Sequence, residues 1–291
     1  MKQNLDTEHG NVPRCLAQPP GGPSAQILRE SRKIIQIGTS GYAYAEWVGP
    51  VYPAGTKPDA YLHTYAGLFA TVELNYSYYR MPSAEQLAGL MRKAPGTLSF
   101  SIKAHASLTH KRDQFTWKEQ AQAFLDAVEP LRQAQRLEAA LFQFPYSFHY
   151  EPENRRYLDR LLGAFREIPR VVEFRNAQWY QDRVIDGLRE RPVTLAAVDL
   201  PALAGLPPTL EQVTSPLGYI RLHGRNKEAW WGADGAARYA YRYDEGELHG
   251  WGERIRRMQT QAERILVYFN NHPQGQAAVN AQRLQELLGV G

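Results

Sequence analysis

The sequence has a single cysteine, Cys15, among its 291 residues. One cysteine cannot form a disulfide within the chain and cannot supply a zinc-binding cluster. Such scarcity is typical of proteins of the reducing cytoplasm, where we expect this protein to be found. No apolar run approaches the roughly 18 residues that a membrane helix needs, and the N-terminal residues lack the apolar core of a signal peptide, so we expect no membrane partner.

An excess of charge of one sign is also lacking. The 34 Lys and Arg residues and the 30 Asp and Glu residues give a net charge of +4, which permits nucleic acid as a partner but does not require it. No glycine-rich dinucleotide loop follows the first apolar run at residues 34–38, and no H-E-x-x-H metal motif occurs. We therefore predict no bound cofactor, and the sequence leaves the oligomeric state open.

The chain divides into a tail and one domain. Residues 1–32 are polar, rich in Pro and Gly and without periodicity, which predicts a disordered tail that contains Cys15. Beyond it, short β-rich runs alternate with amphipathic stretches, as in a parallel sheet covered by helices. The predicted strands are residues 34–38, 71–75, 98–104, 140–144, 171–175, 194–199, 219–224 and 265–270. The predicted helices are residues 59–69, 83–92, 118–135, 153–165, 181–190, 247–261 and 276–288.

The number of strands selects the fold. Eight βα units in residues 33–291 predict an α/β domain of the TIM type, a (β/α)₈ barrel, whose usual length is about 250 residues. A doubly wound open sheet is the alternative, which the missing dinucleotide loop makes weaker.

The predicted interior of the barrel is unusually polar. Side chains alternate across a strand, so in residues 171–175 the apolar Val172 and Phe174 should contact helices while Glu173 and Arg175 point inward. The same sorting turns other charged and polar residues inward, mostly at the carboxyl ends of strands, where barrel enzymes place their active sites. The inward set includes Glu73, Asn75, Lys103, Gln143, Glu173, Arg175, Asp199, Arg221, His223 and Asn270.

This inward set indicates a functional site rather than side chains that only fill the barrel. Buried ions add little net stability compared with apolar packing, so stability alone does not explain them. A salt-bridge lattice without further role is the alternative. Three cations beside three carboxylates would repel a dication, so we predict a site without metal, while a divalent metal held by Glu, Asp and His stays open. The residues that we expect to be catalytic are Glu73, Lys103, Glu173, Asp199 and His223.

Two loops after the last strands predict an anion site. Arg225 follows the seventh predicted strand, and His272 and Gly275 follow the eighth and open a helix, which is where many barrels bind phosphate. The alternative is that Gly275 only caps the helix. Aromatic residues after other strands can stack on a ligand or pack over the barrel end. The expected ligand-binding residues are Tyr42, Trp47, Asn75, Arg175, Arg221, Arg225, Asn270, Asn271, His272 and Gly275.

Seven stretches along the chain carry a family resemblance. They are IGTSGYAYAEW (37–47), VELNYSYYR (72–80), SIKAHASLTH (101–110), LFQFPYSF (141–148), VVEFRNAQW (171–179), YIRLHGR (219–225) and VYFNNHPQGQAAVNAQRL (267–284). In this order they resemble the YecE-like family, domain of unknown function 72. The resemblance implies a TIM-type barrel and no settled activity, cofactor or substrate. Its motif positions are Glu73, Asn75, Lys103, Glu173, Arg175, Arg221, His223, Asn270 and Asn271. Where that pattern has a His after Glu-Phe-Arg, this chain has Asn176, so no imidazole base is expected there.

Three functions fit these observations, and the sequence does not decide whether the protein is an enzyme. The first is a metal-independent hydrolase or lyase for an anionic, phosphorylated sugar-like or nucleotide-like small molecule. The anion would be clamped by arginines, namely Arg175, Arg221 and Arg225. Glu173 or Glu73 would act as base, Lys103 would stabilise developing negative charge or act as acid, and His223 would relay a proton. The second is a nucleic-acid-binding or nucleic-acid-processing barrel whose aromatic loops stack on bases. The third is a ligand-binding protein without catalysis.

Overall fold

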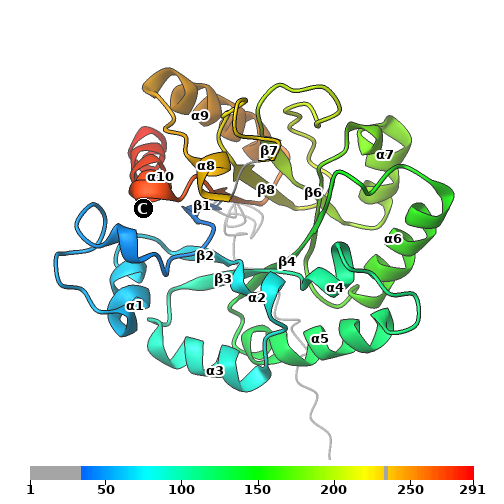
Figure 1. The fold of residues 1–291 in the computed structure, drawn as a ribbon, viewed down its shortest axis with the longest axis horizontal. Coiled ribbons are helices and arrows are strands. Elements are labelled where there is room, and N and C mark those ends of the chain that lie inside the picture. The colour runs from blue at the N-terminus through cyan, green and yellow to red at the C-terminus, as the bar shows by residue number, and fades with distance from the viewer. Residues whose placement is uncertain (1–33, 233–234) are drawn as a thin grey trace, which may run out of the picture. The chain divides into compact units, whose positions relative to one another are not determined.

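The computed structural model describes residues 34–232 and 235–291, so the tail predicted for residues 1–32, with Cys15, lies outside the described residues. Strands and helices alternate along the described chain, which confirms the expected α/β class. Figure 1 shows the helices arranged around the strands. No helix in the described part of the chain combines the length and the apolar character needed to cross a bilayer.

The strands form two parallel sheets. The first has the order β1-β9-β8-β7, in which the strands are β1 (Ile34–Thr39), β9 (Arg264–Phe269), β8 (Leu217–Leu222) and β7 (Ala197–Asp199). The second has the order β2-β3-β4-β5-β6, in which the strands are β2 (Thr71–Leu74), β3 (Ser99–Lys103), β4 (Leu137–Phe144), β5 (Arg170–Phe174) and β6 (Thr194–Leu195). Every predicted strand is present, and the sixth is divided into β6 and β7 around Ala196.

The two sheets meet at two places. On one side a single short stretch of chain serves both, because β6 pairs with β5 and β7 pairs with β8. The N–H of Ala196 between them donates to Val172 O at 2.9 Å. On the other side, Ser40 after β1 forms a parallel bridge with Glu73 in β2, and the N–H of Gly41 donates to Glu73 O at 2.8 Å.

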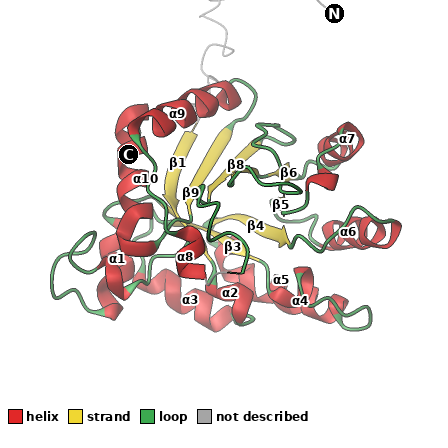
Figure 2. Ribbon diagram, turned by 45° about the horizontal axis from the view of Figure 1, so that its top comes forward, coloured by secondary structure: helices red, strands yellow, loops and turns green. Residues whose placement is uncertain are grey.

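Helices follow most strands, as drawn in Figure 2. They are α1 (Tyr61–Ala66), α2 (Tyr76–Tyr79), α3 (Ala84–Lys93), α4 (Ala106–Thr109), α5 (Trp117–Gln133), α6 (Pro152–Ala164), α7 (Asp182–Glu190), α8 (Gly235–Tyr239), α9 (Glu245–Gln259) and α10 (Gln276–Leu288). Capping boxes begin α3, from Ser83 to Gln86, and α9, from Asp244 to Glu247. The helices α2, α4 and α8 are too short to show the periodicity on which the predicted helices depend, so the sequence predicts none of them. Residues 200–216 between β7 and β8 form no helix.

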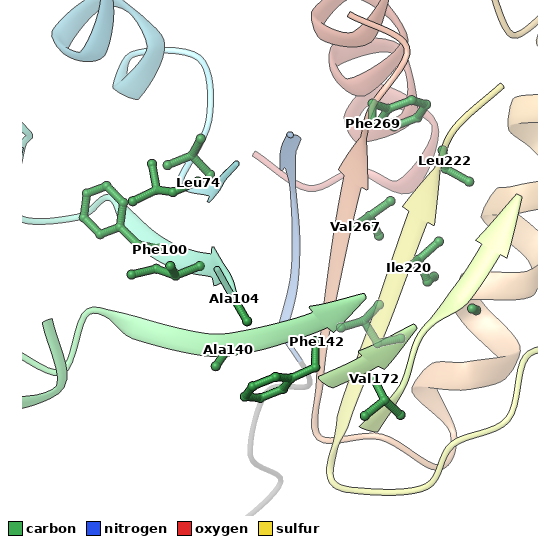
Figure 3. Packing of buried hydrophobic residues seen from close by; sticks show 14 of the residues in the cluster. Leu74, Phe100, Ala104, Ala140, Phe142, Val172, Ile220, Leu222, Val267 and Phe269 are labelled. Carbon is green, nitrogen blue, oxygen red and sulfur yellow. The ribbon is translucent and has the colours of Figure 1, made fainter. Parts of the chain in front are cut away.

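The outer faces of the strands pack against the helices. In β5, Val172 and Phe174 belong to this apolar core, which confirms the predicted alternation in that strand. Ile220 and Val267 project in the same way from neighbouring strands of the first sheet (Figure 3). Burying each such side chain contributes about 1.5–3 kcal/mol, so this layer holds the strands in place.

The inner faces of the strands divide into two layers. A separate buried apolar cluster includes Leu141, Val171 and Leu266, which precede polar or charged residues along their strands. Polar and charged side chains follow them along the same faces toward the carboxyl ends, where Glu173 and Arg221 are buried. The charged side chains therefore gather toward the carboxyl ends of the strands, as the sequence predicts.

Candidate functional site

Arg221, at the inner face of β8, is the centre of the buried polar cluster. Its guanidinium donates to Glu73 twice, from Nε to Oε2 at 2.9 Å and from Nη2 to Oε1 at 2.6 Å. Its Nη1 donates to Glu173 Oε2 at 2.6 Å. The arginine is 1% exposed and both glutamates are 0% exposed. The planar fork of arginine thus connects β8 of one sheet with β2 and β5 of the other by charge-assisted hydrogen bonds.

Glu73 has its carboxylate oxygens fully occupied. Besides Arg221, the hydroxyl of Ser40 donates to Oε1 at 2.6 Å and the hydroxyl of Tyr219 donates to Oε2 at 2.7 Å. A carboxylate offers about four acceptor positions, and four donors already fill them. The expected role of Glu73 as a base therefore does not fit this geometry, and the carboxylate orients Arg221 instead.

Glu173 is held as an anion. Its Oε1 accepts from Arg175 Nε at 2.5 Å and lies 3.3 Å from His223 Nε2. Burial would raise the pKa of the carboxyl, but the charges of Arg175 and Arg221 outweigh it and hold the pKa well below the usual value. A general base works best with a pKa near the working pH, so Glu173 is a fixed charge rather than a proton acceptor.

His223 is a buried neutral imidazole with polar partners at both ring nitrogens. Its Nε2 lies 3.2 Å from Arg175 Nη2, and its Nδ1 lies 3.0 Å from Asn270 Nδ2. Burial, and then the charge of Arg175, lower the pKa of His223 to about 3. The ring does not take up a proton near neutral pH, which removes the expected proton relay through an imidazolium.

Lys103, at the end of β3, is the group of this cluster that titrates near neutral pH. Its Nζ donates to Gln143 Oε1 at 2.8 Å and lies 4.4 Å from the centre of the Tyr78 ring. Burial, and then the charge of Arg221, lower the pKa of the lysine to about 7. Both protonation states are therefore populated at neutral pH, which is the property that acid–base or nucleophilic chemistry requires.

A cavity of about 350 Å³ opens in front of this cluster at the carboxyl ends of the strands. Its basic lining residues are Arg175 and Arg238, and no carboxylate is among the described residues that line it. The guanidinium carbons of these arginines lie 5.5 and 5.8 Å from the Trp230 ring. The remaining walls are largely aromatic, with Tyr78, His110, Tyr146, Trp230, Trp231 and Tyr239. The cavity therefore combines positive charge with flat apolar surface.

Several of these lining residues were not predicted from the sequence. Arg238 and Tyr239 belong to the short helix α8, and no motif in the sequence marks them. For Trp230 and Trp231, the sequence shows only that aromatic residues follow a strand. A larger depression of about 440 Å³ lies between α6 and α7, but it contains none of the predicted site residues.

Asp199 does not point inward, and this prediction is wrong. Both carboxylate oxygens accept from Arg225 Nε at 3.0 Å, and Oδ2 accepts from Trp251 Nε1 of α9 at 3.1 Å. Its neighbour Val198 belongs to the inner apolar cluster instead. The run 195–198 is apolar throughout, so no alternation shows which of its side chains face inward. The sequence therefore does not determine that Val198, and not Asp199, lies on the inner face.

Arg225 likewise lies apart from the cavity lining. Besides Asp199, it binds Glu247 of α9, with Nη1 to Oε1 at 2.6 Å. The predicted anion-binding arginine therefore ties the loop after β8 to a helix. Arg225 is not among the residues that line the cavity.

The loop after β9 is held by contacts within the protein. The amide of Asn271 donates to Tyr241 O at 2.7 Å, and the ring of His272 stacks on Tyr44 at 4.6 Å. Trp47 is buried and donates from Nε1 to His272 O at 2.9 Å. Gly275 has a positive φ of 76° and precedes α10, which fits the capping alternative.

The remaining expected ligand residues are placed around the cluster. Tyr42 packs beside Tyr65, with ring centres 6.0 Å apart, and does not line the cavity. Asn75 comes directly after β2, and its buried Oδ1 has no hydrogen-bond partner within the described part of the chain. In residues 34–232 and 235–291, no group of three His, Cys, Asp or Glu side chains is arranged to hold a metal ion.

Known proteins match almost the whole described chain. Residues 36–291 match the sequence model of a protein family of unknown function, DUF72. The UPF0759 protein YunF of Bacillus subtilis (strain 168) is 29% identical over 272 residues, which cover 88% of this chain and 95% of YunF.

Solved structures agree with this match. A DUF72 family protein from Thermotoga maritima MSB8 is 35% identical, with a TM-score of 0.81, over 88% of this chain and 99% of that protein. One from Enterococcus faecalis V583 is 28% identical, with a TM-score of 0.80, over 89% and 96% of the two chains. As the sequence motifs predict, the protein belongs to the DUF72 family of proteins of unknown function.

Proposed function

We propose that the protein is a metal-independent enzyme, a hydrolase or a lyase, that acts on an anionic small molecule in the cavity at the carboxyl ends of the strands. The substrate class is a phosphorylated sugar-like or nucleotide-like compound. One observation carries the proposal: the cavity joins Arg175 and Arg238 with aromatic walls and has no carboxylate among its described lining residues.

Arg175 is well placed to bind the anion. Its Nε is fixed by Glu173 at 2.5 Å, which orients the guanidinium plane toward the cavity that it lines. Arg238 lies over the same Trp230 ring as Arg175, so two cations flank one aromatic surface. Arginine binds phosphate and carboxylate through paired hydrogen bonds, and a nearby ring can hold the flat part of the ligand.

The chemistry is assigned to Lys103. Its amine has a pKa lowered to about 7 by burial and by Arg221, so it can give or take a proton at neutral pH. Glu173 and Arg221 supply a fixed electrostatic background and change no protonation state during the reaction. This assignment replaces the roles expected for Glu73, Asp199 and His223.

We also propose that residues 33–291 form one domain in which the two sheets close into a single TIM-type barrel. The shared chain of β6 and β7 and the bridge between Ser40 and Glu73 support closure on both sides. Closure would place the carboxyl ends of all strands around one mouth, as in other barrel enzymes.

A ligand screen tests the proposal. Wild-type protein is mixed with ribose 5-phosphate, glucose 6-phosphate, AMP and the matching compounds without phosphate, and its melting temperature is recorded. We expect a phosphorylated compound to raise the melting temperature, and Arg175→Gln to remove that rise. Arg132→Gln, on the exposed end of α5, is the matched control and should keep it. Hits that bind Arg175→Gln as well as wild type, or no hits, would contradict the proposal.

A further inference from the structure

Arginines, and not Lys103, pair with the two buried glutamates of the cluster. Both oxygens of Glu73 and both oxygens of Glu173 accept hydrogen bonds from arginines. The lysine instead donates to the neutral amide of Gln143 at 2.8 Å. An ammonium group without a paired anion, beside fixed guanidinium charges, is destabilised relative to the neutral amine.

The amine also contacts the walls of the cavity. Gln143 and Tyr78, the two side chains that touch Lys103 Nζ, both line the 350 Å³ space in front of Arg175. Lys103 itself is not among the residues that line this space, so Nζ reaches a bound molecule when its side chain moves past Gln143. Because the pKa of this amine is lowered to about 7, a substantial fraction of it is neutral at physiological pH. A desolvated lysine next to other cations is a recognised way to make an amine nucleophilic.

We propose that Lys103 is a covalent nucleophile, whose Nζ forms an imine with the carbonyl group of an anionic aldehyde or ketone held by Arg175 and Arg238. The inference rests on the proposed function, because it needs the anion to bind in this cavity. It also narrows that function, since an imine supports the breaking of a bond beside the carbonyl carbon, as in a lyase.

The reaction balances with the groups at hand. The neutral amine attacks the carbonyl carbon, so a C–N bond forms and the electron pair of the C=O π bond moves to oxygen. One amine proton passes to that oxygen, and one proton from solvent turns the resulting hydroxyl into a leaving water. The nitrogen lone pair then forms the C=N bond, which leaves a protonated imine on Lys103. No oxidant or reductant takes part.

The test traps the imine with a probe that has an aldehyde, a phosphate and an aromatic ring. Protein is incubated with pyridoxal 5′-phosphate at pH 7 and reduced with borohydride, whose hydride adds to the imine carbon to give a stable secondary amine. Peptide mass spectrometry then locates the label. We expect Lys103 to be the main labelled lysine in wild-type protein, and Arg175→Gln to be labelled there at least about tenfold less.

Two variants and one competitor sharpen the result. Lys103→Gln should lose the label, while Lys227→Gln, which changes an exposed lysine after β8, should keep it. In wild-type protein, pyridoxine 5′-phosphate has the phosphate but no aldehyde, and it should protect Lys103 from labelling. This competition needs no variant to fold.

The outcomes separate this inference from the proposed function. If pyridoxine 5′-phosphate binds in a way that depends on Arg175 but Lys103 is not labelled, the imine is wrong and the anion site stands. If labelling falls only on exposed lysines and no phosphate compound binds, both are wrong. Labelling of Lys103 that neither phosphate nor Arg175 influences would show a reactive amine without the proposed anion site, and would also overturn the inference.

Discussion

Arg221 and Glu73 form a buried ion pair with two hydrogen bonds, of 2.9 and 2.6 Å, between the two sheets. Neither side chain is more than 1% exposed. Taking two charges out of water is costly, and the pair is tolerated because Ser40, Tyr219 and Glu173 complete its hydrogen bonds. The pair therefore fixes the position of the cluster beneath the cavity rather than adding much net stability.

Breaking this pair should strongly destabilise the protein. In Arg221→Met, the buried Glu73 loses its cation and Glu173 keeps only Arg175, and we expect the free energy of unfolding to fall by about 3–5 kcal/mol. Urea unfolding at pH 7 measures the change. Arg132→Met removes an exposed arginine that pairs with Glu129 on α5 and should behave like wild type. Similar curves for both variants would show that the buried pair does not organise the interior.

Acid should destabilise the fold through His223. Its pKa falls from 6.5 in an unfolded chain to about 3 in the folded protein. The unfolded state therefore binds a proton first, and stability present above about pH 6.5 is lost as the pH falls toward 3, with a slope of up to about 1.4 kcal/mol per pH unit. Glu173, whose pKa is also depressed, adds a further loss below pH 4.5.

Unfolding measured between pH 7.5 and pH 4 tests this linkage. His223→Gln should make the decline between pH 6.5 and 4.5 less steep, because glutamine binds no proton in either state; His110, whose pKa burial lowers to about 4, keeps part of the decline. His63→Gln, which changes an exposed histidine of α1, should leave the slope as in wild type. Equal slopes in all three proteins would mean that His223 is not a buried neutral imidazole.

Gly38 permits the close approach of β1 and β2. A Cβ at this position would lie 2.1 Å from Thr71 O and 2.9 Å from the hydroxyl of Tyr65, which itself donates to Thr71 O. Gly38→Ala should therefore cost about 1–3 kcal/mol of stability or more, since backbone must move. Gly96→Ala, where nothing lies within 4 Å, is the control. Thermal unfolding that cannot tell the two variants apart would contradict the contact.

Asp199 should matter for the loop after β8 and not for the ligand. Asp199→Asn weakens two bonds to Arg225, which we expect to lower stability by about 1.5–3 kcal/mol. Amide hydrogen exchange in residues 224–226 should become faster, while binding of a phosphate compound stays within about twofold of wild type. A large loss of phosphate-compound binding with unchanged amide hydrogen exchange would show that Asp199 belongs to the ligand site.

The cluster can be predicted from the sequence wherever polar and apolar residues alternate. In β5 and β8 the alternation fixed Glu173, Arg175, Arg221 and His223 on inner faces, as found. In the uniformly apolar run 195–198 it could not, and Asp199 was misplaced. Roles were harder to predict than positions, because they depend on partners from distant strands.

The occupied oxygens of Glu73 illustrate this limit. Ser40 follows β1 and Tyr219 belongs to β8, and the residues around Glu73 in the sequence do not predict either contact. Arg238 shows the same limit for the cavity, since a short helix in a long loop carries no periodic signal. The family resemblance supplied the order of the motifs but no chemistry.

Calorimetric titration with pyridoxine 5′-phosphate measures whether Arg175 binds an anion in the cavity. Loss of a charge-assisted bond of about 1.5–3 kcal/mol corresponds to roughly 10-fold to 150-fold weaker binding. We predict a loss of this size in Arg175→Gln, whose fold is checked by circular dichroism, and none in Arg132→Gln. Equal affinity of Arg175→Gln and wild type would show that Arg175 does not bind the anion.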